Sequence, residues 1–437
     1  MAKLAIISSY DEECGAAFYS ARLKKHLETL GNHQVDVLRL NIGLLRATDS
    51  LSVKKAKVHI NDLINRMKEF DGVCMQFEPG LYGGAVHLAY PRILKLFDAH
   101  PNIVATIHGF HRPSPQGGLW GTLRSIYKKQ RGRGFLSNVW EMYSSVKSRK
   151  FWRQVKQRSN VKVLTFNASD EAYFRQNFEL THISNFPITY YSKEEVSTYK
   201  QKTNRDDYLR KHNLDPSKKY IGIFGFISPY KGHLVAFKML EQLPKDYELL
   251  IIGGEHPHGL EPEVFVSNNI KHLIAYLNND KINNSQPAIW KEFLNGVQFG
   301  QKEFLNLGTA DAKLKERIHF LGQVSDDEMP SFYSVIDYAI LPYMKTFTGQ
   351  SGSGPAVFAL EFNCKTIFSN APVFKILERY FPGAMMFTGI GNYYELASAI
   401  QKYDNFEDEL SDNLKKALEK YNPATMVEKY NEMLGLK

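Results

Sequence analysis

Short apolar runs alternate with longer amphipathic segments along the first half of the chain. Five of the apolar runs are predicted to be buried strands: residues 3–9, 35–40, 72–76, 102–108 and 161–166. Three intervening segments show the spacing of an amphipathic helix: 15–30, 52–70 and 85–99. In the first of these, Leu23, Leu27 and Leu30 share one face, and Gly31 is expected to cap the helix. Strands that alternate with helices in this way build a parallel sheet covered on both faces.

The alternation stops in a polar, charge-rich segment, residues 192–219, and then starts again. Strands are predicted at 220–224, 247–252, 318–321, 338–341 and 366–369. Helices are predicted at 233–243 and 423–434. Ser325 and Glu328 have the spacing of a capping box, which should open a further helix that ends near Val335.

This order of elements predicts an α/β protein with two Rossmann-like domains facing across a cleft, and a nucleotide bound between them. We place the first domain at residues 1–200 and the second at 201–420. Residues 421–437 should form a C-terminal helix that packs back on the first domain.

Two stretches interrupt the pattern. Residues 256–315 separate two strands by far more than the usual connection, which indicates an insertion in the second domain. Residues 112–158 hold twelve Lys and Arg and one acid, and three of the four tryptophans: Trp120, Trp140 and Trp152. No recognised nucleic-acid module accompanies this basic, aromatic insertion, so we expect it to dock on an anionic membrane surface. The alternative is a helical excursion that packs its tryptophans inside.

Composition narrows the class of protein. The chain has 437 residues, enough for about two to three domains, and its 43% hydrophobic and 23% charged residues exclude wholesale disorder. The net charge of +9 favours an anionic partner. Cys14, Cys74 and Cys364 are too few and too far apart for a disulfide framework, and no apolar run is long enough to span a membrane. We therefore expect a cytoplasmic protein.

The turn at residues 10–15 joins the first predicted strand to the first predicted helix. A glycine in such a turn lets backbone N–H groups and the helix N-terminus face a phosphate. The turn lacks GxGxxG, which disfavours a standard dinucleotide site. A plain connection is an equally open interpretation, because three acidic residues would repel an anion: Asp11, Glu12 and Glu13.

His108 ends a predicted buried strand, at the edge where open α/β sheets bind ligands. An imidazole there can donate a hydrogen bond or transfer a proton, and the alternative is a purely structural histidine. His111 follows three residues later, but no further ligand lies close by in the sequence, so no metal site is expected.

Two segments of the second half predict anion binding. Residues 222–232, GIFGFISPYKG, place Lys231 after a glycine-rich turn, where it is either a phosphate ligand or a solvated lysine. Residues 348–354, TGQSGSG, precede Pro355 and form either an anion-binding nest or a surface loop. Glu361 follows within an apolar helix, where its carboxylate should have a buried cation or ligand hydroxyls as partners.

Six segments follow one another in an order and spacing that point to one family: CGAAFYSARLKKHL, QFEPGLYGG, IVATIHG, GIFGFISPYKGHLVAFKML, ELLIIGG and IHFLGQVSDDEMPSFYSVIDYAILPY. Over nearly its whole length the chain resembles the GT-B glycosyltransferases, specifically family 4 of the retaining sugar-nucleotide transferases. The resemblance implies three catalytic residues: His108 facing the transferred sugar, Lys231 neutralising the departing diphosphate, and Glu361 holding the ribose.

The resemblance also implies binding residues. Those on the donor side are Gly15, Gly225, Lys231, Gly253, Gly254, Gln323, Val324, Ser351, Gly352, Ser353 and Gly354. Those on the acceptor side are Glu78 and Gly80.

Two departures from the family pattern concern the donor site. Phe226 stands where the family has an arginine before the lysine. The family's Glu-x7-Glu falls on Ser351 and Ala359 in one register and on Ser353 and Glu361 in another, so neither register restores the first glutamate.

The function implied is a retaining, metal-independent transfer of a hexose-like sugar from a UDP or GDP sugar. The acceptor would be a glycan or a lipid-linked glycan in cell-surface polysaccharide synthesis, with no cofactor beyond the donor. Two alternatives stay open: a catalytically weak GT-B subunit that supports an active partner, and a non-sugar phosphate-binding α/β enzyme.

Overall fold

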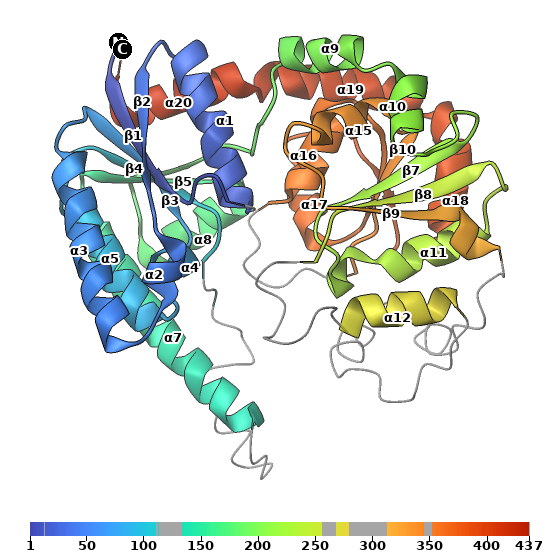
Figure 1. The fold of residues 1–437 in the computed structure, drawn as a ribbon. Coiled ribbons are helices and arrows are strands. Elements are labelled where there is room, and N and C mark those ends of the chain that lie inside the picture. Colours follow the sequence, from blue (N-terminus) through green and yellow to red (C-terminus); the bar gives the residue numbers. More distant parts are fainter. Residues whose placement is uncertain are drawn as a thin grey trace. The chain divides into compact units, whose positions relative to one another are not determined.

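A computed structural model describes residues 1–12, 14–110, 112, 133–255, 268–278, 313–344 and 352–436. These residues belong to two units (Figure 1). Unit 1 contains Met1–Thr189, Phe347–Gly352 and Pro423–Lys437, and unit 2 contains Tyr190–Thr346 and Ser353–Asn422. The chain thus passes from unit 1 to unit 2 after Thr189, compared with the predicted passage after residue 200, and returns at Pro423.

Unit 1 is built on a parallel sheet with the strand order β2-β1-β3-β4-β5-β6. Its strands are β1 Lys3–Ser8, β2 Gln34–Arg39, β3 Gly72–Phe77, β4 Ile103–Ile107, β5 Val161–Thr165 and β6 Ile183–Asn185. Its helices are α1 Gly15–Thr29, α2 Ile42–Arg46, α3 Ser50–Met67, α4 Pro79–Tyr82, α5 Val86–Phe97, α7 Arg133–Lys156, α8 Ala168–Phe178 and α20 Pro423–Leu434. The five strands predicted in this half are confirmed, and β6 is an addition.

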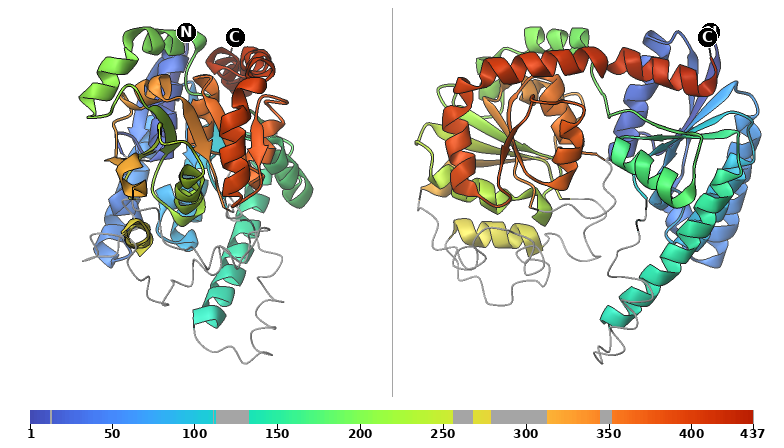
Figure 2. Two further views of the ribbon diagram at one scale, coloured as in Figure 1. Left: turned by 90° about the vertical axis from the view of Figure 1, so that its right-hand side faces the viewer. Right: turned by 180° about the vertical axis from the view of Figure 1, so that it is seen from behind.

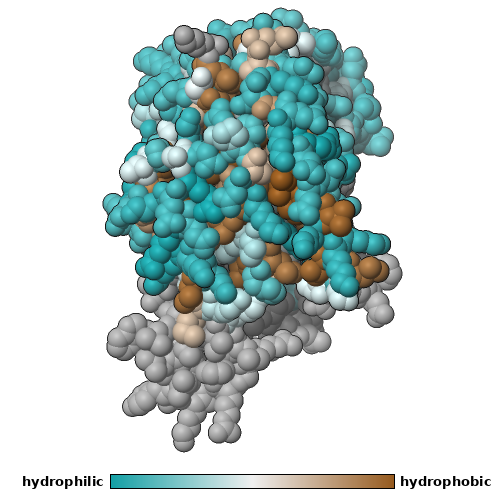
Figure 3. Space-filling model, turned by 90° about the vertical axis from the view of Figure 1, so that its left-hand side faces the viewer, coloured by the Kyte–Doolittle hydropathy of each residue, from teal (hydrophilic) through white to brown (hydrophobic). Residues whose placement is uncertain are grey.

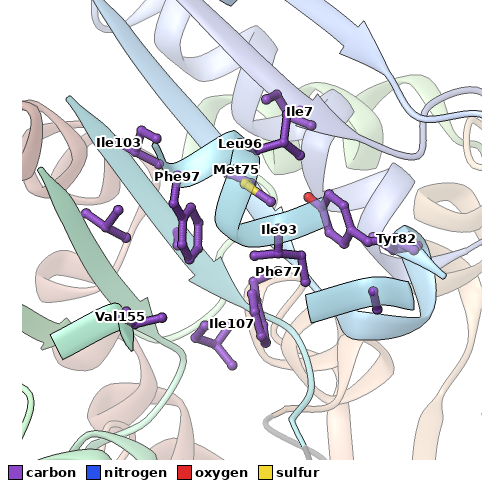
Figure 4. Packing of buried hydrophobic residues seen from close by; sticks show 14 of the residues in the cluster. Ile7, Met75, Phe77, Tyr82, Ile93, Leu96, Phe97, Ile103, Ile107 and Val155 are labelled. Carbon is purple, nitrogen blue, oxygen red and sulfur yellow. The ribbon is translucent and has the colours of Figure 1, made fainter. Parts of the chain in front are cut away.

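The core of unit 1 explains why its strands read as continuous apolar runs. Every residue of β3 is buried, because helices cover both faces of the sheet. Figure 4 shows Phe77 and Ile107 from adjacent strands close to Ile93 and Phe97 of α5. On the outer face that holds α3 and α5, apolar residues come to the surface only in patches between hydrophilic ones (Figure 3).

Unit 2 contains a second parallel sheet, ordered β12-β11-β10-β7-β8-β9. Its strands are β7 Lys219–Phe224, β8 Tyr247–Ile252, β9 Ile318–Gly322, β10 Tyr338–Leu341, β11 Lys365–Ser369 and β12 Met386–Thr388. Its helices are α9 Lys193–Lys202, α10 Arg205–Lys211, α11 His233–Glu241, α12 Asn268–Leu277, α15 Met329–Val335, α16 Gly354–Glu361, α17 Pro372–Glu378, α18 Tyr393–Lys402 and α19 Glu407–Lys420. Within the described part of this unit, three short 3₁₀ helices accompany them: Pro229–Lys231, Leu314–Arg317 and Tyr403–Asn405.

Helix ends account for two differences from the sequence prediction. The segment predicted as a polar boundary forms α9 and α10, and Ser192 with Glu195 makes a complete capping box for α9. At the predicted capping box, Glu328 N donates to Ser325 Oγ at 3.3 Å, but the helix begins at Met329. Ser325 therefore makes one hydrogen bond of a capping box, but it lies one turn before the first residue of α15.

Gly31 does not cap α1 as predicted. The cap residue is Leu30, and the left-handed conformation falls on Asn32, with φ of 50°. Gly31 is needed for space instead, since a Cβ there would lie 2.7 Å from the carbonyl oxygen of Leu27.

The two described tryptophans of the basic insertion differ in burial, and Trp152 follows the alternative in which the tryptophans pack inside. Residues 113–132, with Trp120, lie outside the described residues, and so does His111. Trp152 on α7 is buried, 1% exposed, and packs against Phe77 and Phe174, because the C-terminal part of α7 covers the sheet. The N-terminal part of α7 extends beyond the sheet (Figures 1 and 2), and Trp140 is 54% exposed.

Helix α20 follows α19 directly but belongs to unit 1, where it contacts residues far earlier in the sequence (Figure 2). The Asn102 side-chain nitrogen donates to the carbonyl oxygen of Leu434 at 2.8 Å, and Lys162 Nζ donates to that of Met433. No helix of the described residues has the length and apolar character needed to cross a membrane.

Candidate functional site

In unit 2, the carboxyl ends of β10, β7, β8 and β9 lie side by side. Most residues predicted on the donor side follow these strands directly: Gly225, Lys231, Gly253, Gly254, Gln323 and Val324. The carboxyl edge of a parallel sheet is where open α/β folds bind ligands. The sheet order thus gathers at one edge residues that lie almost one hundred positions apart in the sequence.

Two glycines let the loops after β7 and β8 approach each other. Gly253 has φ of 148°, and a Cβ there would lie 2.3 Å from the carbonyl oxygen of Gly225. Gly225 has φ of 91°, and a Cβ there would lie 3.0 Å from Lys231 Nζ. Side chains at either position would therefore displace the lysine or its loop.

Lys231 is buried, with 4% of its surface exposed, so it is not the solvated lysine of the alternative interpretation. Its Nζ donates to Tyr343 Oη at 2.5 Å and to the carbonyl oxygen of Phe224 at 3.3 Å. No carboxylate pairs with it among the described residues. Burial lowers the pKa of Lys231, because the charged form is separated from water. This buried ammonium therefore meets only neutral oxygens.

Helix α16 begins beside this lysine. Tyr343 Oη is 3.1 Å from Ser353 Oγ, and Ser353 is the N-cap residue of α16, although its side chain does not cap the helix. The first N–H groups of a helix have no partner within it, so this end suits an anion. Gly354 opens the helix, and a Cβ there would lie 3.2 Å from Tyr190 Oη. Gly352 is described and half-buried, whereas Ser351 lies outside the described residues.

Glu361 has backbone partners that the sequence did not predict. Its side chain is buried, and its two oxygens accept hydrogen bonds from Tyr190 N at 2.7 Å and Tyr191 N at 3.1 Å. Hydrogen bonds from backbone N–H groups stabilise the carboxylate in its charged form. The carboxylate thus ties the start of unit 2 to the end of α16.

Gln323 follows β9, the strand at one end of the sheet. Its Oε1 accepts a hydrogen bond from Gly254 N at 3.3 Å, and the side chain is otherwise exposed. Val324, the next residue, is buried. The pair offers a polar amide beside an apolar surface, which can contact the edge and face of a planar base.

In unit 1, His108 follows β4 and is held by buried neighbours. Its Nε2 donates to Gln76 Oε1 at 2.8 Å, and the edges of Tyr19 and Phe166 pack against its ring, with centroids 5.2 and 5.0 Å away. Burial lowers the pKa of His108 to about 3. The imidazole is therefore neutral near pH 7, able to exchange hydrogen bonds but not to deliver a proton.

A buried polar cluster lies behind His108, and the sequence analysis did not single it out. The Tyr430 hydroxyl from α20 hydrogen-bonds that of Thr106 at 2.5 Å and that of Tyr19 at 3.2 Å. Gln76 is fully buried, and its Nε2 makes no hydrogen bond to a described group. Burial raises the pKa of Tyr430, and the Gln76 side chain opposes this increase, so the two groups face each other.

The two residues predicted on the acceptor side, Glu78 and Gly80, follow strand β3. Glu78 is the neighbour of His108 across the sheet, because Phe77 pairs with Ile107 in the strand register. Burial raises the pKa of Glu78, and Arg46 opposes this. Arg46 Nε donates to the carbonyl oxygen of Gly80 at 2.8 Å, which holds α2 against the turn.

Gly15 opens α1, and a Cβ there would meet nothing within 4 Å. The N-cap is Cys14, whose sulfur accepts a hydrogen bond from Ala17 N at 3.4 Å. Within the described ranges, no group of three or more His, Cys, Asp or Glu could hold a metal ion.

No protein-family profile and no curated protein matches the sequence. Solved structures do match in fold. HepE from Anabaena, in complex with UDP and glucose, superposes with a TM-score of 0.62 at 14% identity and covers 100% of both chains. A glycosyltransferase from Rickettsia africae has a TM-score of 0.61 at 13% identity, covering 99% of this chain and 98% of its own. Sucrose-phosphate synthase from Thermosynechococcus elongatus has a TM-score of 0.59 at 14% identity, covering 100% of this chain and 99% of its own.

The chain has the GT-B fold. Its two parallel sheets correspond to the two Rossmann-like domains of that architecture, as the sequence predicted. In this GT-B chain the buried lysine lies in unit 2 and the neutral histidine in unit 1.

Proposed function

We propose that this chain is a glycosyltransferase that moves a sugar from a nucleotide diphosphate donor to a hydroxyl of an acceptor. One observation carries the proposal: Lys231 is a buried ammonium at the carboxyl edge of a parallel sheet, and its described partners are neutral. Such a charge is costly without an anion, and a diphosphate supplies one.

The chemistry of transfer fits these residues. As the bond between the anomeric carbon and the diphosphate oxygen breaks, negative charge grows on the leaving oxygen. Lys231 and the N–H groups of Ser353 and Gly354 at the start of α16 would stabilise that charge before it forms. His108, being neutral, would orient the sugar through hydrogen bonds while the acceptor hydroxyl forms the new bond and loses its proton.

The finer assignments rest on the sequence resemblance. They are retention of the anomeric configuration, independence of a metal, a UDP or GDP donor, and an acceptor that is a glycan or lipid-linked glycan of the cell surface. HepE, which has a similar fold, is described in complex with UDP and glucose, and this favours UDP as the first donor base to test.

The exposed part of α7 supports a peripheral position on an anionic membrane. Trp140 stacks on Tyr143 with ring centroids 5.7 Å apart, and Lys147 Nζ lies 5.3 Å from the Tyr143 ring. Exposed basic residues continue along the helix: Arg149, Lys150 and Arg153. Tryptophan favours the headgroup level and cations favour anionic lipid, so this surface would present the protein to a lipid-linked acceptor.

Lys231→Ala provides the direct test. It should weaken UDP binding by about 1.5–3 kcal/mol, the size of a charge-assisted contact. Lys238→Ala is the matched control, since Lys238 lies on the following helix and pairs with Glu241 at 3.1 Å. Unchanged calorimetric affinity for both UDP and GDP in the Lys231 variant would remove the lysine from the donor site.

A product assay separates the enzyme from the catalytically weak subunit. An active transferase releases UDP or GDP from its sugar when acceptor is present, and excess EDTA should leave the rate unchanged. Binding of nucleotide without release, with every donor and acceptor tried, would favour the supporting subunit. The sequence feature that favours the supporting subunit is Phe226, which stands where the family has an arginine.

A further inference from the structure

Lys231 differs from most buried lysines in the chemistry of its surroundings. Buried cations usually pair with a carboxylate, which neutralises them. Here Nζ donates to the Tyr343 hydroxyl at 2.5 Å and to a backbone carbonyl at 3.3 Å, and the Tyr230 hydroxyl also interacts with it. The Tyr343 and Tyr230 rings also lie close, with their centroids 4.6 and 5.6 Å from Nζ. Aromatic faces and neutral oxygens stabilise an ammonium without cancelling its charge.

Tyr343 connects this lysine to the start of α16. Because an ammonium can only donate, Tyr343 Oη accepts from Lys231, and its own proton is free to be donated to Ser353 Oγ. The tyrosine is 1% exposed, and Ser369 Oγ donates to its carbonyl oxygen at 2.7 Å. Tyr343 is therefore held by hydrogen bonds at both its backbone and its hydroxyl, and the hydroxyl lies between Lys231 and the N-cap residue Ser353.

We infer that Tyr343 is a positioning residue for the diphosphate of the donor. It keeps Lys231 protonated and directed along the sheet edge, and it aligns the N-terminus of α16 with the lysine. This inference rests on the proposed function, since it concerns how the same site binds its anion. A carboxylate at this position would hold the lysine equally well but would compete with the diphosphate for its charge.

The inference predicts a particular pH dependence. Besides Tyr343, the titratable groups Tyr230 and His233 face the ammonium. Burial lowers the pKa of Lys231, the Tyr230 hydroxyl opposes this, and His233 is neutral near pH 7 because its own pKa is lowered to about 3. The Tyr343 oxygen also accepts a hydrogen bond from the ammonium, which favours the charged form, so its removal should lower the pKa of Lys231 further. Tyr343→Phe should then bind UDP about tenfold more weakly at pH 7, the loss expected for a hydrogen bond to a charged group. The loss should grow between pH 7 and pH 9 as the lysine gives up its proton.

Calorimetric titration of UDP across this range tests the inference on the full chain. The ratio of wild-type to variant affinity at each pH cancels the ionisation of UDP itself. Tyr333→Phe is the matched control, because the Tyr333 hydroxyl is also buried beside α16 and donates to Pro355 O at 3.2 Å, without touching Lys231. The control should keep a constant ratio near one.

A pH-independent ratio for Tyr343→Phe would overturn the inference while leaving the proposed function intact, provided that Lys231→Ala still loses UDP affinity. If Lys231→Ala binds UDP normally, both the inference and the proposed donor site fail. Should Tyr343→Phe not fold, 4-fluorophenylalanine introduced at position 343 fills the space of the hydroxyl with an atom that accepts hydrogen bonds only weakly and does not ionise. The ratio should then rise with pH in the same direction, and a flat ratio would again overturn the inference.

Discussion

The hydroxyl groups of Tyr19 and Tyr430 lie 3.2 Å apart, although 411 positions separate the two residues in the chain. Both are buried, and Tyr430 also meets the Thr106 hydroxyl at 2.5 Å. The edge of the Tyr19 ring packs on His108. Tyr19 therefore connects Tyr430 of the C-terminal helix to the candidate site residue of unit 1.

Tyr430→Phe should destabilise unit 1. The substitution keeps the ring but leaves the buried hydroxyls of Tyr19 and Thr106 short of a partner, which typically costs about 1–3 kcal/mol. Urea unfolding followed by circular dichroism measures the change. Tyr394→Phe, at a 54% exposed position, is the control, and equal midpoints for the two variants would contradict the role of the cluster.

His108 should contribute hydrogen bonding and no acid–base step. Because burial holds its pKa near 3, the rate of the wild-type enzyme should show no limb from this histidine between pH 5 and 8. His108→Ala should lower kcat about 10- to 100-fold, the effect of a lost hydrogen bond.

Gln76→Glu provides the complementary measurement on the same pair. A carboxylate 2.8 Å from Nε2 raises the pKa of the imidazole, so a pH-dependent limb should appear in the rate of this variant. A limb already present in the wild type and lost in His108→Ala would show that the histidine exchanges protons after all.

Acid should destabilise the fold partly through His233. Burial and the nearby Lys231 lower the pKa of this histidine to about 3, below the usual value of about 6.5 in an unfolded chain. Between these values the unfolded state binds more protons, so stability falls as pH drops below 6.5, by up to about 1.4 kcal/mol per pH unit for one group. Above pH 6.5 the histidine is neutral in both the folded and the unfolded state, so it no longer makes the unfolding free energy depend on pH.

His233→Leu should therefore flatten the plot of unfolding free energy against pH between 6 and 4.5. The difference between wild type and variant removes the contribution of carboxylates common to both. Parallel curves for the two proteins would mean that His233 accepts a proton in the folded state.

Glu361→Gln distinguishes the observed role of this residue from the one implied by resemblance. An amide nitrogen in place of either oxygen faces a backbone N–H group, so stability should fall by about 2–3 kcal/mol. Affinity for UDP, measured below the melting temperature, should change little. A large loss of UDP affinity with an unchanged melting temperature would instead indicate a ribose contact.

The exposed part of α7 should bind vesicles that contain anionic lipid. Changing Lys147, Lys150 and Arg153 to Glu should abolish co-sedimentation, since each basic residue contributes about 1 kcal/mol near such a surface. The matched charge reversal on α3, at the exposed Lys54, Lys55 and Lys57, should leave binding unchanged. Equal binding to neutral and anionic vesicles would contradict the electrostatic interpretation.

The sheets could be predicted because fully buried parallel strands leave a strong signal, as the apolar run of β8 does. The positions of His108 and Lys231 after predicted strands made them candidate site residues before any contact was known. Tyr343 was missed because a tyrosine after a strand is common, and only the folded chain brings its hydroxyl to the lysine. The partners of Glu361 are equally non-local, being backbone groups about 170 positions away, and backbone partners leave no trace in side-chain patterns.

Helix α20 also determines the order in which this protein can be completed during synthesis. The residues of unit 2 all precede Pro423, so they leave the ribosome while Met426, Val427 and Tyr430 are still unavailable to the core of unit 1. Domains usually finish folding in the order in which they are translated. Here the unit begun first cannot close its core until Pro423–Leu434 have been synthesised, so it finishes folding no earlier than the unit that was begun second.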